Sequence, residues 1–376
     1  MSSPQPTNYL SSLKQMDEKF IFFLIICIVF ILLICIILYI IYLTKLKNSE
    51  CDYMNSLYPS VDGKIRAIND NDQDCSGNLY DYYIKTAYNA CSGGSYKNDF
   101  VDICNLKAVI KQGVRCLDFE VYSVDNQPVV ATSTQDDFYV KETFNSVSFA
   151  DVMKTIDSYG FAGGTCPNPT DPILIHLRIK SKNQKIFSKM AEIFKSYDKM
   201  LGKEYSFESS GINLGTTPLL KLKNKIILIV EKNIKESNSF LENTNFLEYV
   251  NLTSNSMFMR AYEYYNIKNN HDITELTEYN KKNMTIVFPD KGINPSNPSG
   301  TLCRTYGCQM VAIRYQYVDD FLKENTLFFD KASYAFALKP ANLRYKPVTI
   351  PDPTPQNPNY SYATRDVSSD YYNFKV

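Results

Sequence analysis

The 376-residue sequence contains no tryptophan, only two histidines, and no excess of either charge. Forty basic side chains balance forty acidic ones, which removes any bulk electrostatic reason to expect a nucleic-acid or strongly acidic partner. The missing tryptophan, beside abundant Tyr, Phe, Ile, Asn and Lys, indicates a compositional bias without bearing on mechanism. The scarcity of histidine matters more, because only His176 and His271 can supply imidazole chemistry.

The longest hydrophobic stretch is the uncharged run 20–43, "FIFFLIICIVFILLICIILYIIYL". It exceeds the roughly 20 apolar residues that a membrane-spanning helix needs. A cleaved signal peptide has an apolar core of only about 7 to 15 residues, so the run indicates a retained anchor. Tyr39 and Tyr42, followed by Lys45 and Lys47, are typical of the membrane interface. We therefore expect a single-pass membrane protein whose transmembrane helix contacts the lipid bilayer.

The sequence gives two opposing indications of membrane orientation. Basic residues close to the span favour a cytoplasmic C-terminal part: Lys45, Lys47, Lys64 and Arg66 follow the span, whereas Lys14 and Lys19 precede it. An even set of eight cysteines outside the span instead suits an oxidising compartment. Three glycosylation sequons, at Asn251, Asn283 and Asn359, carry little weight because such triplets often arise by chance.

Beyond the anchor, the pattern predicts one folded unit in which strands and helices alternate. This alternation implies parallel strands, and the length suits a closed (β/α)8 barrel. The strand-like runs are 82–86, 114–122, 128–133, 173–179, 226–230, 310–316 and 334–339, and the helical candidates include 100–112, 148–160 and 183–201. The expected organisation is an N-terminal tail (1–19), the transmembrane helix (20–43), a polar stalk (44–77), a first half-barrel (78–232), a connector (233–249), a second half-barrel (250–350) and an irregular tail (351–376).

Several motifs, in the right order, resemble the catalytic X and Y regions of eukaryotic phosphoinositide-specific phospholipase C. They are "YYIKTAYNAC" (82–91), "QGVRCLDFEVY" (112–122), "PVVATST" (128–134), "YNKKNMTIVFP" (279–289), "GCQMVAIRYQ" (307–316) and "YAFALKPANLR" (334–344). The resemblance covers about residues 79–345 and implies a distorted TIM-type barrel with its site at the carboxyl ends of the strands. In that family two histidines transfer protons, and calcium is held by one asparagine and three carboxylates.

Both histidine positions of the family hold other residues here. The resemblance places Tyr88 at the first, and a phenol with a reference pKa of about 10 exchanges protons poorly near neutrality. Thr132 stands at the second and does not titrate usefully. General acid–base groups contribute roughly 10² to 10⁴ each to rate, so the resemblance implies that most of the family's catalytic power is missing.

The calcium ligands are only partly kept. The resemblance retains Asn89 and assigns Asp118 and Glu120 to the next two positions, but the fourth carboxylate is replaced by Arg178. A guanidinium stays charged and cannot ligate a cation. We therefore expect no cofactor, and calcium only if the degenerate site is retained.

The stretch "PILIHLRIKS" (172–181) allows two interpretations of the site. In the register that the resemblance implies, its alternation directs His176 and Arg178 into the barrel, and Arg178 lies across from Asp118 and Glu120 on the second strand. The simpler hypothesis is an internal ion pair that replaces the metal. The alternative is a metal-free enzyme in which Arg178 clamps phosphate and His176 is a relocated base. His271 fits an exposed loop.

The family's substrate-binding residues are also replaced. Where it carries lysines after the fifth strand, this chain has Ile229 and Glu231, and where its second half carries Arg and Tyr, this chain has Ile286 and Phe288. Altered proton-transfer, metal-binding and substrate-binding positions beside a well-kept scaffold favour an enzyme that has lost its activity.

The cysteines fall into two groups. Cys116 and Cys308 occupy positions where the family has barrel cysteines, so we expect buried thiols. Six others are foreign to the motifs, and we expect them to be bridged: Cys51, Cys75, Cys91, Cys104, Cys166 and Cys303. Cys51 to Cys75 and Cys91 to Cys104 are the candidate loops, although sequence does not fix connectivity. Disulfides on a cytosol-facing domain would resemble the membrane proteins of large DNA viruses.

Two hypotheses follow from the sequence. The first is a membrane-anchored, catalytically inactive phospholipase-C-like barrel that serves as a structural or binding module, with a lipid headgroup or a membrane protein as partner. The second is a divergent, metal-independent phosphodiesterase acting on phosphoinositides or another lipid phosphodiester.

Overall fold

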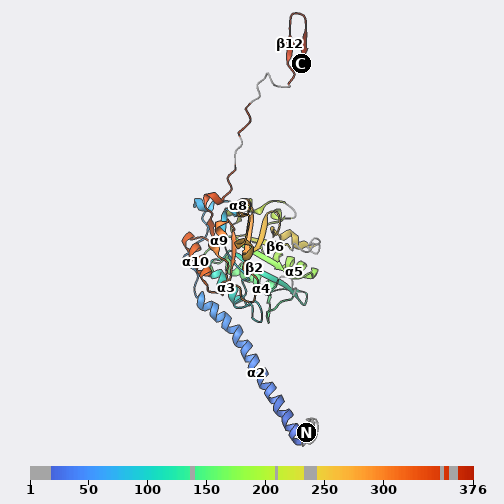
Figure 1. The fold of residues 1–376 in the computed structure, drawn as a ribbon, viewed down its shortest axis with the longest axis vertical. Coiled ribbons are helices and arrows are strands. Elements are labelled where there is room, and N and C mark those ends of the chain that lie inside the picture. Colours follow the sequence, from blue (N-terminus) through green and yellow to red (C-terminus); the bar gives the residue numbers. More distant parts are fainter. Residues whose placement is uncertain (1–17, 136–139, 208–210, 233–243, 348–350, 355–362) are drawn as a thin grey trace, which may run out of the picture. The chain divides into compact units, whose positions relative to one another are not determined.

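The computed structural model describes residues 18–376 except 136–139, 208–210, 233–243, 348–350 and 355–362. Within it the chain divides into two compact units, 1–344 and 345–376. The first unit holds the barrel and the long N-terminal helix (Figure 1). The second contains a small antiparallel hairpin of β12 (Asp366–Ser368) and β13 (Asn373–Lys375), where the sequence had suggested only irregular structure.

Eight parallel strands form the barrel, in the order β7-β6-β5-β2-β1-β10-β9-β8. Among the described residues no ladder joins β7 to β8, so the barrel is nearly closed. This arrangement confirms the predicted TIM-type fold. The strands are β1 (Tyr82–Ala87), β2 (Cys116–Val124), β5 (Ile173–Ile179), β6 (Ile226–Glu231), β7 (Leu252–Ser254), β8 (Met259–Glu263), β9 (Met284–Phe288) and β10 (Met310–Ile313).

Two predicted strands lie outside the barrel wall. β3 (Gln127–Ala131) pairs antiparallel with β2 and with β4 (Val147–Ser148), and β11 (Phe336–Leu338) pairs antiparallel with β1. The wall is completed by β7, β8 and β9, which the strand prediction did not include. β7 is only three residues long and β8 is mostly half-buried, so neither has the continuous apolar run of a buried parallel strand.

Amphipathic helices cover the outside of the barrel. In α5 the buried residues Ile186, Phe187, Met190 and Phe194 recur at helical spacing, and Asn183 caps the helix by accepting the N–H of Lys185. The α-helices of the barrel are α3 (Ile103–Lys111), α4 (Phe149–Gly160), α5 (Gln184–Lys195), α7 (Tyr264–Lys268), α8 (Ile273–Lys282), α9 (Gly300–Thr305) and α10 (Asp320–Ala332). Short 3-10 helices occur at Gln73–Cys75, Leu79–Asp81, Lys203–Tyr205, Leu214–Thr216, Leu219–Leu222, Asn245–Tyr249 and Ala341–Leu343.

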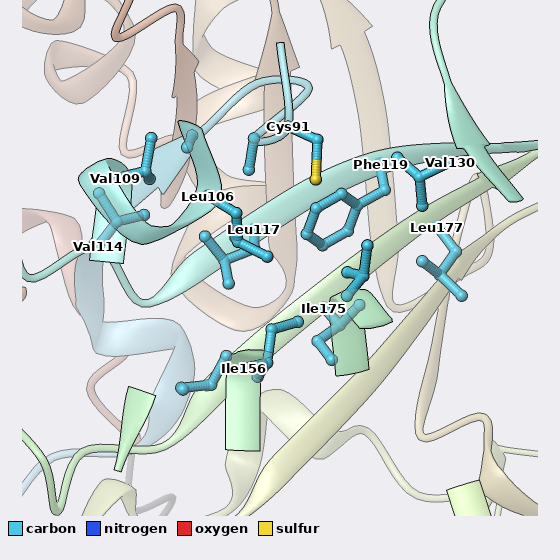
Figure 2. Close-up of a cluster of buried hydrophobic side chains, with 14 of the residues drawn as sticks. Cys91, Leu106, Val109, Val114, Leu117, Phe119, Val130, Ile156, Ile175 and Leu177 are labelled. Carbon is cyan, nitrogen blue, oxygen red and sulfur yellow. The ribbon is translucent and has the colours of Figure 1, made fainter. Parts of the chain in front are cut away.

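The strand alternation creates two cores. Outward-facing residues such as Phe119, Ile175 and Leu177 pack against helical residues such as Ile156 (Figure 2). Inward-facing residues, including Leu174 on β5, belong to a second cluster inside the barrel. Because His176 and Arg178 share the face of Leu174, β5 directs both polar side chains into the barrel interior.

The N-terminal helix α2 (Glu18–Leu57) is long and apolar enough to cross a membrane. It continues 14 residues past the predicted span, which replaces the first part of the expected stalk. The rest of that segment packs against the barrel: Ile65 and Ile68 are buried, and the N–H of Ile68 donates to Asp171 at 2.8 Å. The expected stalk has few apolar residues, so its sequence pattern did not indicate that it packs against the barrel.

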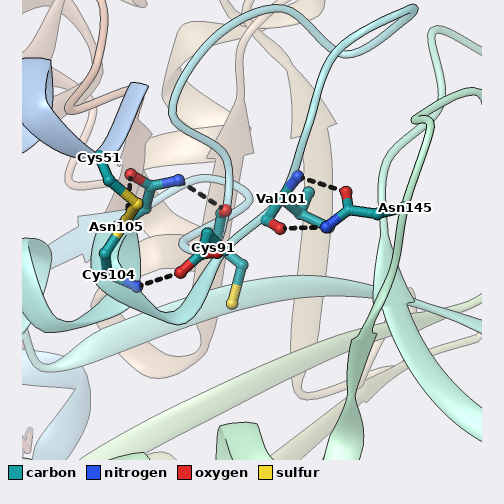
Figure 3. Close-up of a disulfide and its surroundings, with 7 residues drawn as sticks. Cys51, Cys91, Val101, Cys104, Asn105 and Asn145 are labelled. Carbon is teal, nitrogen blue, oxygen red and sulfur yellow. Dashed lines mark hydrogen bonds between the residues drawn. A yellow bond between two sulfur atoms is a disulfide. The ribbon is translucent and has the colours of Figure 1, made fainter. Parts of the chain in front are cut away.

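The disulfide pairing differs from both candidate loops. Cys51 on α2 bonds to Cys104 on α3, with Cα atoms 5.8 Å apart (Figure 3). Cys75 and Cys91 are buried free thiols, as are Cys166 and Cys303, so the expectation that these six cysteines would be substantially bridged was wrong. The pairing depends on the docking of α2 beside α3, which residue spacing does not reveal. Cys116 and Cys308 are buried free thiols, as expected.

The buried position of Asn251 also bears on the sequons. Its side chain is fully buried and accepts the N–H of Leu228 at 2.9 Å, so the folded barrel leaves no room for a glycan there. The sequon at Asn359 and most of the expected connector lie outside the described residues.

Candidate functional site

The predicted site residues meet at the carboxyl ends of β1, β2 and β5. The parallel ladder between β2 and β5 sets Asp118 beside His176 and Glu120 beside Arg178. Asn89 follows β1 and adopts a left-handed backbone conformation, with φ of 44°. Alternation along both strands places all four β2 and β5 side chains on the interior face, as the sequence predicted.

Arg178 lies at the centre and uses every donor of its guanidinium. Nε donates to Oδ1 of Asp118 at 3.0 Å, and Nη2 donates to Oδ2 of the same carboxylate at 2.6 Å and to Oδ1 of Asn89 at 2.9 Å. Nη1 donates to Oε1 of Glu120 at 2.7 Å and to the hydroxyl of Tyr88 at 3.3 Å. A guanidinium has five N–H groups, and each has an acceptor here.

The two carboxylates receive further hydrogen bonds from around them. Oε2 of Glu120 accepts the hydroxyl of Tyr122 at 2.6 Å and the N–H of Ser133 at 2.9 Å. Oδ2 of Asp118 accepts the N–H of Asn89 at 3.2 Å. Both carboxylates are therefore anchored by neutral donors as well as by the cation.

The electrostatics of the cluster favour its charged form. Burial alone would raise the pKa of Asp118, but the Arg178 charge and hydrogen bonds from His176 and Arg178 hold it well below its usual range. Burial would likewise lower the pKa of Arg178, yet Asp118, Tyr88 and Glu120 raise it well above its usual value. The buried site therefore holds a stable ion pair.

Aromatic rings enclose the cluster. The Arg178 guanidinium lies 4.6 Å from the ring centroid of Tyr88 and 5.2 Å from that of Phe288. The network is buried, because none of its members is more than 2% exposed: Asn89, Asp118, Glu120, His176 and Arg178. Ile229 and Ile286, at two substrate-binding positions of the family, are fully buried in the interior cluster.

His176 is held on both ring nitrogens. Nδ1 lies 2.8 Å from Oδ1 of Asp118, and Nε2 lies 3.1 Å from Oγ of Ser254. Ser254 ends β7 and was missed in the sequence, because a lone serine after an unrecognised strand gives no signal. The Ser–His–Asp connectivity resembles that of hydrolytic triads. Here, however, the three side chains are fully buried, and Asp118 is shared with Arg178.

The remaining predicted residues lie apart from this network. The hydroxyl of Thr132 donates to the carbonyl of Tyr96 at 3.1 Å, beyond the end of β3. Glu231 ends β6 and is half-buried, whereas His271 is exposed in a loop, as expected. The structure therefore brings the family's calcium-ligand positions together with Tyr88 at the first histidine position, and the Phe288 ring packs against Arg178.

Comparison with known proteins agrees with this geometry. The X domain of phosphatidylinositol-specific phospholipase C matches residues 75–232, and its Y domain matches residues 226–342. The barrel belongs to the phosphatidylinositol-specific phospholipase C family. Together the two domains account for all eight barrel strands.

Solved structures support the same fold. PLC21 of L. pealei superposes with a TM-score of 0.58 at 19% identity, covering 72% of this chain. PLC21 of S. officinalis superposes with a TM-score of 0.56 at 17% identity, again over 72% of this chain. The present chain covers only 38% of the length of each, and no curated protein sequence matches it.

Proposed function

We propose that this protein is a membrane-anchored phospholipase-C-like barrel that acts as a structural or binding module and not as a catalyst. The observation that carries the proposal is Arg178, whose five donors all bind within the barrel at the place where the family resemblance puts calcium and substrate. Because the side chain of Arg178 fills this place, we assign it a structural role in the barrel.

The residues present do not fit calcium. Oxygen atoms of Asn89, Asp118 and Glu120, the remaining ligand positions, accept N–H groups from Arg178. A divalent cation at this place would face a permanently charged guanidinium a few ångströms away.

Proton transfer lacks a suitable group as well. Tyr88 stands at the first histidine position with its hydroxyl on Arg178, and Thr132 at the second binds a backbone carbonyl. His176 is the one imidazole in the barrel interior, but Asp118 and Ser254 occupy both of its nitrogens. A general base must reach the proton that it removes, and this ring has no free nitrogen.

A second candidate function rests on the same histidine. The hydrogen bond that Nδ1 of His176 donates to Asp118 orients the ring as a carboxylate orients a catalytic base, and Arg178 carries the charge of a phosphate clamp. This favours a metal-independent phosphodiesterase, provided that substrate can displace the internal partners of both residues. The burial of the network argues against it.

The membrane part of the proposal rests on α2. Its apolar side chains over 20–42 are mostly exposed on the isolated helix, which leaves them available to lipid. We propose that this helix anchors the barrel in a bilayer, so that the folded unit presents its surface to a lipid headgroup or to another membrane protein.

Turnover of lipid separates the two functions. Full-length protein in detergent is incubated with phosphatidylinositol vesicles, and release of inositol phosphate is measured beside an active phospholipase C. We expect no release above the protein-free blank, with or without calcium. Release that is lost in His176→Ala or Arg178→Ala, but kept in the surface variant Glu192→Gln, would establish the phosphodiesterase instead.

Thermal unfolding tests the metal assignment. Because the ligand oxygens are already bound to Arg178, millimolar calcium is expected to leave the melting temperature of the protein unchanged. A real site occupied far above its Kd would stabilise the fold by mass action, by about 2.7 kcal/mol at a hundredfold excess. A calcium-dependent rise of several degrees would therefore contradict the ion-pair interpretation.

A further inference from the structure

The last turns of α2 dock onto the barrel beside the start of α3. The contact consists of the Cys51–Cys104 disulfide, the fully buried side chain of Met54 and the side chain of Glu50, which is 7% exposed. Figure 3 shows Cys51 reaching Cys104 next to Asn105, whose amide donates to the carbonyl of Cys91 at 3.1 Å. Glu50 lies beyond the apolar run and therefore outside the bilayer.

Glu50 faces a second carboxylate, that of Asp99 in the loop before α3. A Cβ built on Gly94 would collide with both Oε1 of Glu50 and Oδ2 of Asp99, so these two oxygens lie within about 5 Å of each other. The absence of a side chain at Gly94 leaves the space in which the two groups meet. Their proximity joins the membrane helix to a loop of the barrel.

The two carboxylates are supplied with donors unequally. Asp99 accepts the N–H of Ser95 at 2.8 Å and the N–H of Phe100 at 3.1 Å. Neither carboxylate oxygen of Glu50 has a donor of good hydrogen-bond geometry among the described residues, although both are buried; the N–H of Phe100 lies near Glu50 but donates to Asp99. Two adjacent ionised carboxylates, of which Glu50 has only this one nearby N–H, are strongly unfavourable in a buried place. A positive occupant must therefore lie between them.

A proton fits this place better than a metal ion. Both oxygens of Asp99 already accept backbone N–H groups, and Asp102 uses Oδ1 to accept the N–H of Cys104. In the described chain, Glu50 and Asp99 belong to no cluster of three metal-ligating side chains. Calcium needs six to eight oxygen ligands, whereas one proton satisfies a carboxyl pair.

We propose that Glu50 and Asp99 share one proton when α2 is docked, and that this proton makes the attachment of the membrane helix to the barrel sensitive to pH. The proposal is independent of whether the barrel is catalytic. The disulfide acts in parallel as a covalent lock, so the pH response is fully expressed when Cys51 and Cys104 are not bridged.

The direction of the response follows from the groups that face Glu50. Burial, then Asp99, and to a smaller extent Asp102, raise the pKa of Glu50 from 4.5 to about 10. The disulfide does not titrate, and burial raises the pKa of the nearby Cys91 thiol, which stays neutral. The docked state thus holds a proton that the undocked state releases above pH 4.5. Docking is strongest below about pH 4.5 and weakens about tenfold per pH unit up to about 10.

The undocking equilibrium can be measured by thiol labelling. In a Cys51→Ser, Cys104→Ser background in detergent, Met54→Cys reports undocking because position 54 is buried only when α2 is docked. Tyr53→Cys, at an exposed neighbouring position, supplies the intrinsic labelling rate at each pH. The ratio of the two rates, read by mass spectrometry at each site, cancels the ionisation of the thiol itself.

We expect the labelling ratio to rise about 100-fold between pH 5.5 and 7.5 with Glu50 present, and to stay constant in Glu50→Gln. The exposed control Glu192→Gln should keep the full rise. A ratio that is flat in the parent, or that rises equally in Glu50→Gln, would overturn the shared proton. A ratio that changes with EDTA at fixed pH would overturn it in favour of a bound cation.

Discussion

Replacing Arg178 by glutamate is expected to lower the free energy of unfolding of the calcium-free protein by about 5 kcal/mol. Removing one partner of a buried ion pair typically costs about 3 to 5 kcal/mol, because the other charge is left uncompensated. Arg178→Glu additionally brings a third carboxylate against Asp118 and Glu120, which are almost fully buried. Chemical denaturation in EDTA measures the loss.

The same substitution is expected to create a response to calcium. Asn89, Asp118, Glu120 and the introduced carboxylate would supply the hard oxygen ligands that calcium prefers, at positions that Arg178 now connects. We therefore expect millimolar calcium to raise the melting temperature of Arg178→Glu while leaving the parent unchanged. Hydrolysis should still be absent, because Tyr88 and Thr132 remain at the histidine positions.

A surface charge reversal provides the control. Nη2 of Arg66 lies 3.7 Å from Oδ2 of Asp72, and most of the Arg66 side chain is exposed. Arg66→Glu should therefore change the free energy of unfolding by no more than about 1 kcal/mol. It should also confer no calcium response. An Arg178→Glu protein as stable as the parent in EDTA would show that the guanidinium is not paired with Asp118 and Glu120.

The centre of the site could be predicted because one strand carries an unambiguous pattern. Ile175, Leu177 and Ile179 alternate with His176 and Arg178, which indicates both the strand 173–179 and the face that each side chain occupies. The family motifs then align β2 with β5. The family resemblance put Arg178 at a ligand position across from Asp118 and Glu120, and the register of the two strands sets Glu120 beside Arg178.

Features that depend on tertiary docking were not predictable in the same way. Ser254 contacts His176 because β7 is held beside β6, but a three-residue strand has too little pattern to recognise. The Cys51–Cys104 bond requires α2 to continue past the apolar run and lie against α3. Loop length favours shorter pairings such as Cys91 to Cys104 in an unfolded chain, and tertiary packing overrides that preference.

Loss of the Cys51–Cys104 disulfide is expected to lower the free energy of unfolding by about 2 to 4 kcal/mol. The bond closes a loop of 53 residues, and in the chain-entropy description a loop of that length restricts the unfolded state by about 4 kcal/mol. Cys51→Ser and Cys104→Ser should show the same loss, and the double variant should be no worse than either single one. Chemical denaturation without reductant measures all three.

Reductant supplies the matched test of the same bond. Dithiothreitol should lower the stability of the parent to that of Cys51→Ser and leave the variant unchanged, while Cys35→Ser in the apolar run should behave as the parent. Alkylation without reductant, followed by mass spectrometry, should find Cys51 and Cys104 bridged and the buried Cys75, Cys91 and Cys166 reduced. Recovery of both Cys51 and Cys104 as alkylated thiols would mean that α2 is held to α3 by packing alone.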